Sequence, residues 1–205
     1  MKILEKISFI FLVAGLSLFL VAVAALAIVP ALMVNKIENT AMLPSEVPEG
    51  FTHVYASTED YHKALFKGRD IYIAEACWHC HSQYVRPISN ESLQYGAVST
   101  PGEYQTKLQL PQLLGTRRVG PDLIRESGKR SNDWHFAHLY NPKSTSPLSV
   151  MPTYPWFFEK DENGKPKPNE RGYALVAYLQ WLGSWITQDT LAQDAGAILT
   201  SPQGR

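Results

Sequence analysis

The feature that most constrains this chain is a run of 28 uncharged, mostly apolar residues from Ile7 to Val34. About 20 such residues in a helix cross the hydrocarbon core of a bilayer, and a longer run allows a tilted span. A cleaved signal peptide is the main alternative, because the Ala-Leu-Ala sequence at 25–27 resembles a cleavage site, but its apolar part would run for only about 7–15 residues. A buried core helix is disfavoured, since no other segment is apolar enough to enclose it. The sequence therefore predicts a single transmembrane anchor.

The charge of the chain is balanced, with 19 basic and 19 acidic residues. A protein that binds nucleic acid needs a clear basic excess to neutralise phosphates, so this class is disfavoured. Lys2 and Lys6 precede the apolar run, with Glu5 between them, and a basic bias marks the cytoplasmic side of a span. We therefore expect the N-terminus inside the cell and the rest of the chain outside.

The remainder of the chain has the pattern of a loop-rich, mainly α-helical body. From residue 61, apolar side chains recur at three- and four-residue steps, which predicts a helix leading into the cysteines. A second helix is predicted over residues 173–182, whereas proline and glycine predict loops over residues 86–121 and 159–172. The expected organisation is a transmembrane anchor at 1–36, a stalk at 37–60, a folded domain at 61–185 and a flexible tail at 186–205.

Both cysteines of the chain lie in the pentapeptide Cys77-Trp78-His79-Cys80-His81. This Cys-x-x-Cys-His pattern is the attachment signature of a c-type haem. Thiols three residues apart on a helical turn can reach the two vinyl groups of one porphyrin edge, and His81 then lies under the iron as an axial ligand. The sequence therefore predicts one covalently attached haem c on Cys77 and Cys80. Such attachment takes place outside the bacterial inner membrane, which agrees with a cytoplasmic N-terminus.

Two other interpretations of the motif are open. A Cys-x-x-Cys pair also serves thiol–disulfide exchange, but that motif belongs to a βαβ unit, and the sequence shows no such pattern. A zinc site would need His79, His81 and one of the distant His135 and His138 in place of a second cysteine pair. A loop-rich helical body behind a membrane anchor favours the haem.

A haem that only transfers electrons needs a sixth ligand, so that both oxidation states share one geometry, and a thioether there raises the potential. Met151 is the candidate by elimination, and Pro152 stiffens the loop that would present it. Ordinary packing of Met151 and a bis-histidine haem that uses His135 or His138 are the alternatives. The other methionines lie in the membrane segment or the stalk, at positions 1, 33 and 42.

Three further groups are candidates for supporting the haem. The ring N–H of a ligating histidine needs an acceptor that fixes its orientation, and the carbonyl of Pro121, in a Gly-Pro-Asp turn, can supply one. Haem propionates are carboxylates that arginine binds bidentately, so Arg86 and Arg118 are candidate partners. The plain alternatives are a simple turn at Pro121 and solvated surface charges at the arginines.

The motif is part of a longer match. The chain resembles the mono-haem subunit of cbb3-type cytochrome c oxidases, the FixO/CcoO family. The segments that carry the resemblance are residues 68–72, the stretch 77–87, Tyr95-Gly96 with Ser99, residues 120–123, Trp134-His135 with His138, residues 151–156 and the helix around Tyr178-Leu179.

The resemblance implies a class I cytochrome c fold on a single N-terminal transmembrane helix, with His81 and Met151 as axial ligands. It implies a subunit that is not an enzyme by itself. Electrons would come from a di-haem cytochrome subunit or a soluble cytochrome, and would pass to a b haem of the catalytic haem–copper subunit, where oxygen is reduced. It also implies that Ser99 lies at the interface with the catalytic subunit, near a bound calcium ion. The expected location is the bacterial inner membrane, with the haem domain in the periplasm.

Three alternatives share the haem but differ in what it does. The chain could be the small cytochrome c subunit of a nitric oxide reductase, whose terminal acceptor differs. It could be a membrane-tethered shuttle that works without a fixed partner. It could also be a haem-based gas sensor, which would need an open or weak sixth coordination site.

Overall fold

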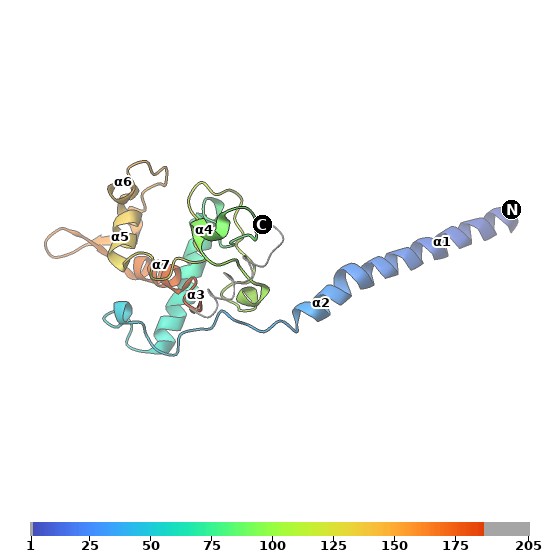
Figure 1. Cartoon of the computed structure of the whole chain (residues 1–205), viewed down its shortest axis with the longest axis horizontal. Helices are drawn as coiled ribbons and strands as arrows, with labels where there is room; N and C mark the ends of the chain where they lie inside the picture. The colour runs from blue at the N-terminus through green and yellow to red at the C-terminus, as the bar shows by residue number, and fades with distance from the viewer. Residues whose placement is uncertain (1, 187–205) are drawn as a thin grey trace, which may run out of the picture. The chain divides into compact units, whose positions relative to one another are not determined.

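The computed structural model describes residues 2–186, and the chain divides into two compact units, Met1–Glu38 and Asn39–Arg205. Both units consist mainly of helices and loops, as the sequence predicts (Figure 1). All of the expected C-terminal tail except residue 186 lies outside the described residues.

The N-terminal unit is one long apolar helix. It consists of α1 (Lys2–Val23), a π-helical turn (Ala24–Ile28) and α2 (Val29–Val34). The stretch Glu5–Val34 is long and apolar enough to cross a membrane. The π-helical turn directly precedes the turn that holds Pro30. Proline donates no backbone hydrogen bond and its ring crowds the preceding turn, so a locally wider turn lets the helix continue.

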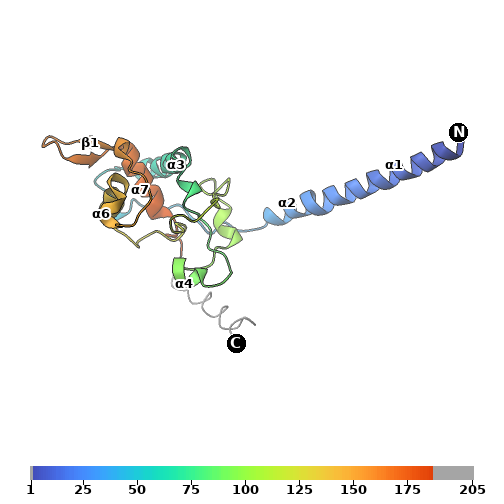
Figure 2. The same cartoon turned by 90° about the horizontal axis from the view of Figure 1, so that it is seen from above.

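Two helices, α3 (Thr58–Ala74) and α7 (Glu170–Trp181), pack against each other at the centre of the second unit (Figures 1 and 2). Ser57 caps α3 by accepting a hydrogen bond from the Asp60 amide. The side chain of Asn169 caps α7 by accepting from two amides of its first turn. This cap explains why α7 begins three residues before the predicted start at residue 173.

The contact between α3 and α7 depends on Gly68. A β-carbon at this position would lie 2.0 Å from the carbonyl oxygen of Ala174 and 2.7 Å from the β-carbon of Tyr178. The two backbones therefore approach more closely than any side chain on Gly68 would permit. The edge of this contact is aromatic, because the rings of Tyr72 and Tyr178 meet at 5.7 Å between centroids.

The remaining helices and strands are short: α4 (Glu91–Tyr95), α5 (Asn132–Tyr140), α6 (Pro142–Thr145), β1 (Phe158–Lys160) and β2 (Pro166–Pro168). The prediction of a loop over 159–172 is wrong in part. In this segment β1 and β2 pair as an antiparallel hairpin, with Glu159 opposite Lys167. The predicted loop over 86–121 contains α4 and a 3₁₀ turn at Pro101–Tyr104. A five-residue helix and a single turn leave little periodicity to detect in the sequence.

From Asn39 onwards, the segment expected to be a stalk is part of the second unit. Ala41 has no exposed surface, and Phe51 lies in the hydrophobic core with Tyr61. The indole nitrogen of Trp181 donates to the Met42 carbonyl at 3.1 Å. These contacts hold residues 41–51 on α3 and α7, the two helices that support the cysteine motif.

Replacing Gly68 by alanine tests the central helix contact. Alanine favours a helix over glycine by about 1 kcal/mol, but its β-carbon would overlap the carbonyl of Ala174. We expect Gly68→Ala to lower the free energy of unfolding by about 1–3 kcal/mol, as measured by denaturant titration. Asp70→Ala, at an exposed position of the same helix, serves as the control and should leave stability nearly unchanged. A Gly68→Ala protein as stable as the parent would contradict the close contact.

Candidate functional site

The cysteine motif forms one tight turn directly after α3. Ala76 adopts a left-handed backbone conformation with φ of 58°, which redirects the chain into a 3₁₀ turn over Cys77–His79. The amides of Cys80 and His81 both donate to the Cys77 carbonyl, at 3.1 and 3.0 Å. The two cysteines and His81 therefore start from a single helical turn.

The thiol of Cys77 does not have the lowered pKa of a redox-active cysteine. No disulfide joins Cys77 to Cys80. Burial, with a smaller effect of Glu75, raises the pKa of Cys77 to about 12, whereas thiol–disulfide exchange depends on a lowered thiol pKa. Among residues 2–186, no three His, Cys, Asp or Glu side chains lie close enough to hold a metal ion together. The raised pKa of Cys77 thus argues against the thiol–disulfide interpretation.

His81 is fixed by a contact with a backbone carbonyl. Its Nδ1 lies 2.9 Å from the carbonyl oxygen of Pro121. Because a carbonyl oxygen only accepts, Nδ1 donates and the lone pair is left on Nε2. Burial lowers the pKa of His81, although the Pro121 carbonyl opposes this shift. The imidazole is therefore neutral near pH 7, in the form that can ligate a metal.

The carbonyl that orients His81 belongs to residues 116–123, which we call the strap. Gly120 lies against the imidazole, so closely that a β-carbon there would be 2.3 Å from Cε1 of His81. The Tyr72 hydroxyl donates to the His81 carbonyl from the other direction, at 3.0 Å. Backbone hydrogen bonds join the strap to the cysteine motif, from Arg117 to His79, from Gly120 to Cys80 and from Leu123 to Ser82.

Met151 lies on a loop after α6. It is half buried and packs against the same hydrophobic core as Cys77 and Trp78. Its amide donates to the Ser149 hydroxyl at 3.2 Å, and the Tyr154 amide ties the end of the loop to the Leu139 carbonyl of α5. This loop is thus tied to α5 on the C-terminal side of Met151.

The two histidines of α5 have different surroundings. The Nδ1 of His138 lies 2.6 Å from the Thr145 hydroxyl, and its ring stacks on Trp134 at 4.7 Å. His135 is buried, and its Nε2 lies 3.7 Å from a carboxylate oxygen of Glu126, too far for a hydrogen bond. Burial, with smaller effects of His138 and Arg130, lowers the pKa of His135 to about 4.

Arg86 and Arg118 both pair with the buried carboxylate of Glu91. Burial alone would raise the pKa of Glu91, but the hydrogen bonds from Arg118 and Arg86 outweigh it and lower the pKa to about 2. Arg118 also donates to the Ser82 hydroxyl at 2.6 Å and to the Tyr84 carbonyl at 2.5 Å. Arg86 is the more exposed of the two side chains.

Ser99 points into the fold. Its hydroxyl accepts a hydrogen bond from the Val85 amide, and its own amide donates to the Val85 carbonyl, both at 3.0 Å. The described contacts of Ser99 therefore join the chain after the cysteine motif to the segment that follows Gly96.

Sequence reasoning considered Gly120 and Asp122 only as neighbours of Pro121 in the Gly-Pro-Asp turn, and it missed Glu91. Asp122 is fully buried and accepts hydrogen bonds from the segment after His81. Only Gly120 had a local signal, because a glycine beside a proline marks a tight turn. The roles of the two acids depend on partners that come from other parts of the chain.

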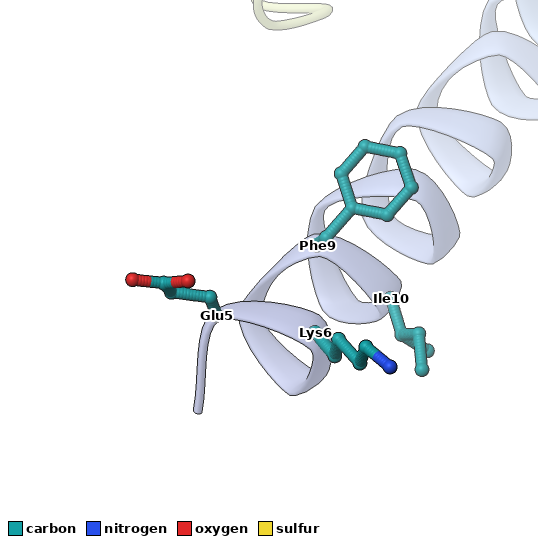
Figure 3. Close-up of a pocket in the computed structure, with 4 residues that line it drawn as sticks. All are labelled: Glu5, Lys6, Phe9 and Ile10. Carbon is teal, nitrogen blue, oxygen red and sulfur yellow. The ribbon is translucent and has the colours of Figure 1, made fainter. Parts of the chain in front are cut away.

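A separate concavity lies on the first turns of α1, lined by Glu5, Lys6, Phe9 and Ile10. Figure 3 shows these four side chains spreading outward from the helix rather than converging. This concavity contains none of the predicted site residues and is part of the N-terminal unit.

The family described as cytochrome C oxidase, mono-heme subunit/FixO matches residues 1–173 of the chain. No curated protein matches the chain at a significant level. The match extends over most of the sequence and includes the apolar helix, the cysteine motif, the strap and Met151. The chain therefore belongs to this family of single-haem cytochrome c subunits of cbb3-type oxidases, which confirms the resemblance seen in the sequence.

Replacing Gly120 by alanine tests the packing of the strap on His81. The added β-carbon would displace the imidazole, so we expect the haem-loaded fraction of the protein to fall by about tenfold, in the range seen for groups that support metal ligands. The measurement is haem absorbance per mass of purified protein. Val119→Ala, at the exposed neighbouring position, should load normally. Full loading of Gly120→Ala would show that the strap does not constrain His81.

Proposed function

We propose that this subunit relays single electrons through one haem c, which Cys77 and Cys80 hold as thioethers. His81 and Met151 would hold its iron. The observation that carries this proposal is the contact between His81 and the Pro121 carbonyl. This contact orients the ring and leaves the lone pair of Nε2 available to a metal.

The donor set fits a c-type haem. Backbone hydrogen bonds hold the two cysteines and His81 on a single helical turn. The neutral Cys77 thiol suits addition to a vinyl group catalysed during maturation, and the half-buried Met151 offers a soft thioether to iron. When bound, the haem supplies an iron that exchanges one electron without changing its coordination.

The residues of the chain then hold the ligands and exclude water. Pro121 orients His81, and Gly120 leaves room for the imidazole. Val85 and Leu113, both buried, belong to the core that surrounds the motif. Ligands that stay fixed in apolar surroundings lower the reorganisation energy of electron transfer. The chain itself supplies no catalytic group in this account, so the subunit is a non-catalytic part of an oxidoreductase complex.

We extend the proposal to the haem propionates, with Arg86 as their direct partner and Arg118 as its support. Arg86 is the stronger candidate, because half of its side chain is exposed while Glu91 holds only one side of the guanidinium. Arg118 already pairs with Glu91 and donates hydrogen bonds to Ser82 and Tyr84. It would therefore act by holding Glu91 and Arg86 in place.

The proposed setting is the bacterial inner membrane. The stretch Glu5–Val34 would span the bilayer with the N-terminus in the cytoplasm and the haem unit in the periplasm. The proposed partners are a di-haem cytochrome subunit as the donor and the b haem of the catalytic haem–copper subunit as the acceptor. The family match supports an oxidase complex over a free shuttle, a nitric oxide reductase or a gas sensor.

Met151→Ala in the assembled complex tests both the ligand and the relay. Loss of the thioether should abolish the low-spin reduced spectrum, allow carbon monoxide to bind this haem, and slow oxygen uptake with the native donor by at least about tenfold. A small mediator that reduces the catalytic subunit directly should restore oxygen uptake. Met42→Ala, at an exposed methionine, is the matched control.

The relay would be refuted if Met151→Ala lost its sixth ligand while electron delivery stayed at the parental rate. The ligand assignment would be refuted if the parental low-spin spectrum survived in Met151→Ala.

A further inference from the structure

The carboxylate of Asp122, in the strap, has no exposed surface. One oxygen accepts from the Ser82 hydroxyl at 2.6 Å and from the Tyr84 amide at 2.8 Å. The other accepts from the Ile124 amide at 2.9 Å. Asp122 thus joins the strap to the segment directly after His81 through two hydrogen bonds, and the third holds the turn that leads to Ile124.

All of these neighbours are donors. The Ser82 hydroxyl already accepts from Arg118, so its own proton is directed to Asp122. The amides of Tyr84 and Ile124 can only donate. An asparagine side chain has the same shape but only one accepting oxygen. Its NH2 group would face one of these donors, and a buried N–H would be left without a partner. The site therefore requires a carboxylate, even though burying a charge is costly.

The position of Asp122 gives it direct control over the acceptor of His81. The Pro121 carbonyl belongs to the peptide unit that joins Pro121 to Asp122. The orientation of this unit depends on the ψ angle of Pro121 and the φ angle of Asp122. The three hydrogen bonds of the carboxylate hold Asp122 in place, so a change in its φ angle, which would turn the carbonyl that lies 2.9 Å from His81, is opposed.

We propose that Asp122 is a positioning residue for the haem iron: by locking the Pro121 peptide, it sets the strength of the hydrogen bond to His81 and, through it, the reduction potential. This inference rests on the proposed function, in which His81 is an iron ligand. A strong hydrogen bond at Nδ1 makes the imidazole a more basic ligand, which stabilises the oxidised iron. Asp122 acts through Pro121 and His81 and does not itself contact the iron.

The competing explanation is that the backbone hydrogen bonds of the strap hold Pro121 without help. Gly120 and Leu123 flank the turn and donate to Cys80 and Ser82 at 3.0 and 2.9 Å. In that case Asp122 would contribute only to stability, as other buried acids do.

The test compares Asp122→Asn with Glu103→Gln in the haem-loaded full chain. Glu103 is an equally buried carboxylate, paired with Arg125 and bonded to the Trp185 indole, but it has no contact with the strap. Two quantities are measured: the solvent exchange rate of the His81 ring N–H, by NMR with ¹⁵N-labelled histidine, and the reduction potential. Loss of a buried negative charge alone could raise the potential, so the exchange rate decides between the explanations.

We expect Asp122→Asn to retain its haem, to exchange the His81 ring proton at least about tenfold faster than the parent, and to have a higher potential. Glu103→Gln should lose stability but keep the parental exchange rate. A parental exchange rate in Asp122→Asn would overturn the inference. A parent whose haem lacks His81 as a ligand would instead overturn the proposed function.

A second variant keeps the inference testable if Asp122→Asn fails to fold. Ser82→Ala removes one of the three hydrogen bonds and leaves the carboxylate charge in place. It should accelerate exchange of the His81 proton in the same direction but less strongly. An unchanged exchange rate in a folded, haem-loaded Ser82→Ala protein would contradict the proposal that Asp122 holds the Pro121 peptide in place.

Discussion

The site depends on one contact, in which the carbonyl of Pro121 lies 2.9 Å from Nδ1 of His81. The contact places the proton of the neutral ring on Nδ1 and leaves the lone pair on Nε2, and Gly120 lets the strap approach closely enough to make it. The turn that carries Cys77 and Cys80 and the strap are joined by backbone hydrogen bonds. The same set of interactions therefore places both thiols and the imidazole.

Buried ion pairs replace regular secondary structure in the loops between α3 and α5. Arg125 pairs with Glu103, and Arg118 pairs with Glu91, with most of these side chains out of solvent. Breaking such a pair leaves an uncompensated buried charge, so each pair fixes which loops lie together. Asp122 belongs to this pattern, but its neighbours include the residues next to the proposed iron ligand.

The sequence predicted those features whose signal is local. The apolar helix, the cysteine motif and most of α3 each follow from consecutive residues or a short period, and the mainly α fold is confirmed. The cap at Asn169 and the hairpin of β1 and β2 were missed, because short elements carry weak patterns. Asp122 and Ser82 are 40 residues apart, so nothing in the sequence near either one identifies its partner. The assignments of Met151, Pro121, Arg86 and Arg118 remain proposals.

The most direct measurement for the central claim is mass spectrometry of the denatured, protease-digested chain. The account predicts that the peptide containing Cys77 and Cys80 carries the mass of one haem, and that no other peptide does. An unmodified peptide, or a disulfide between the two cysteines, would contradict the covalent haem on which the proposed relay depends.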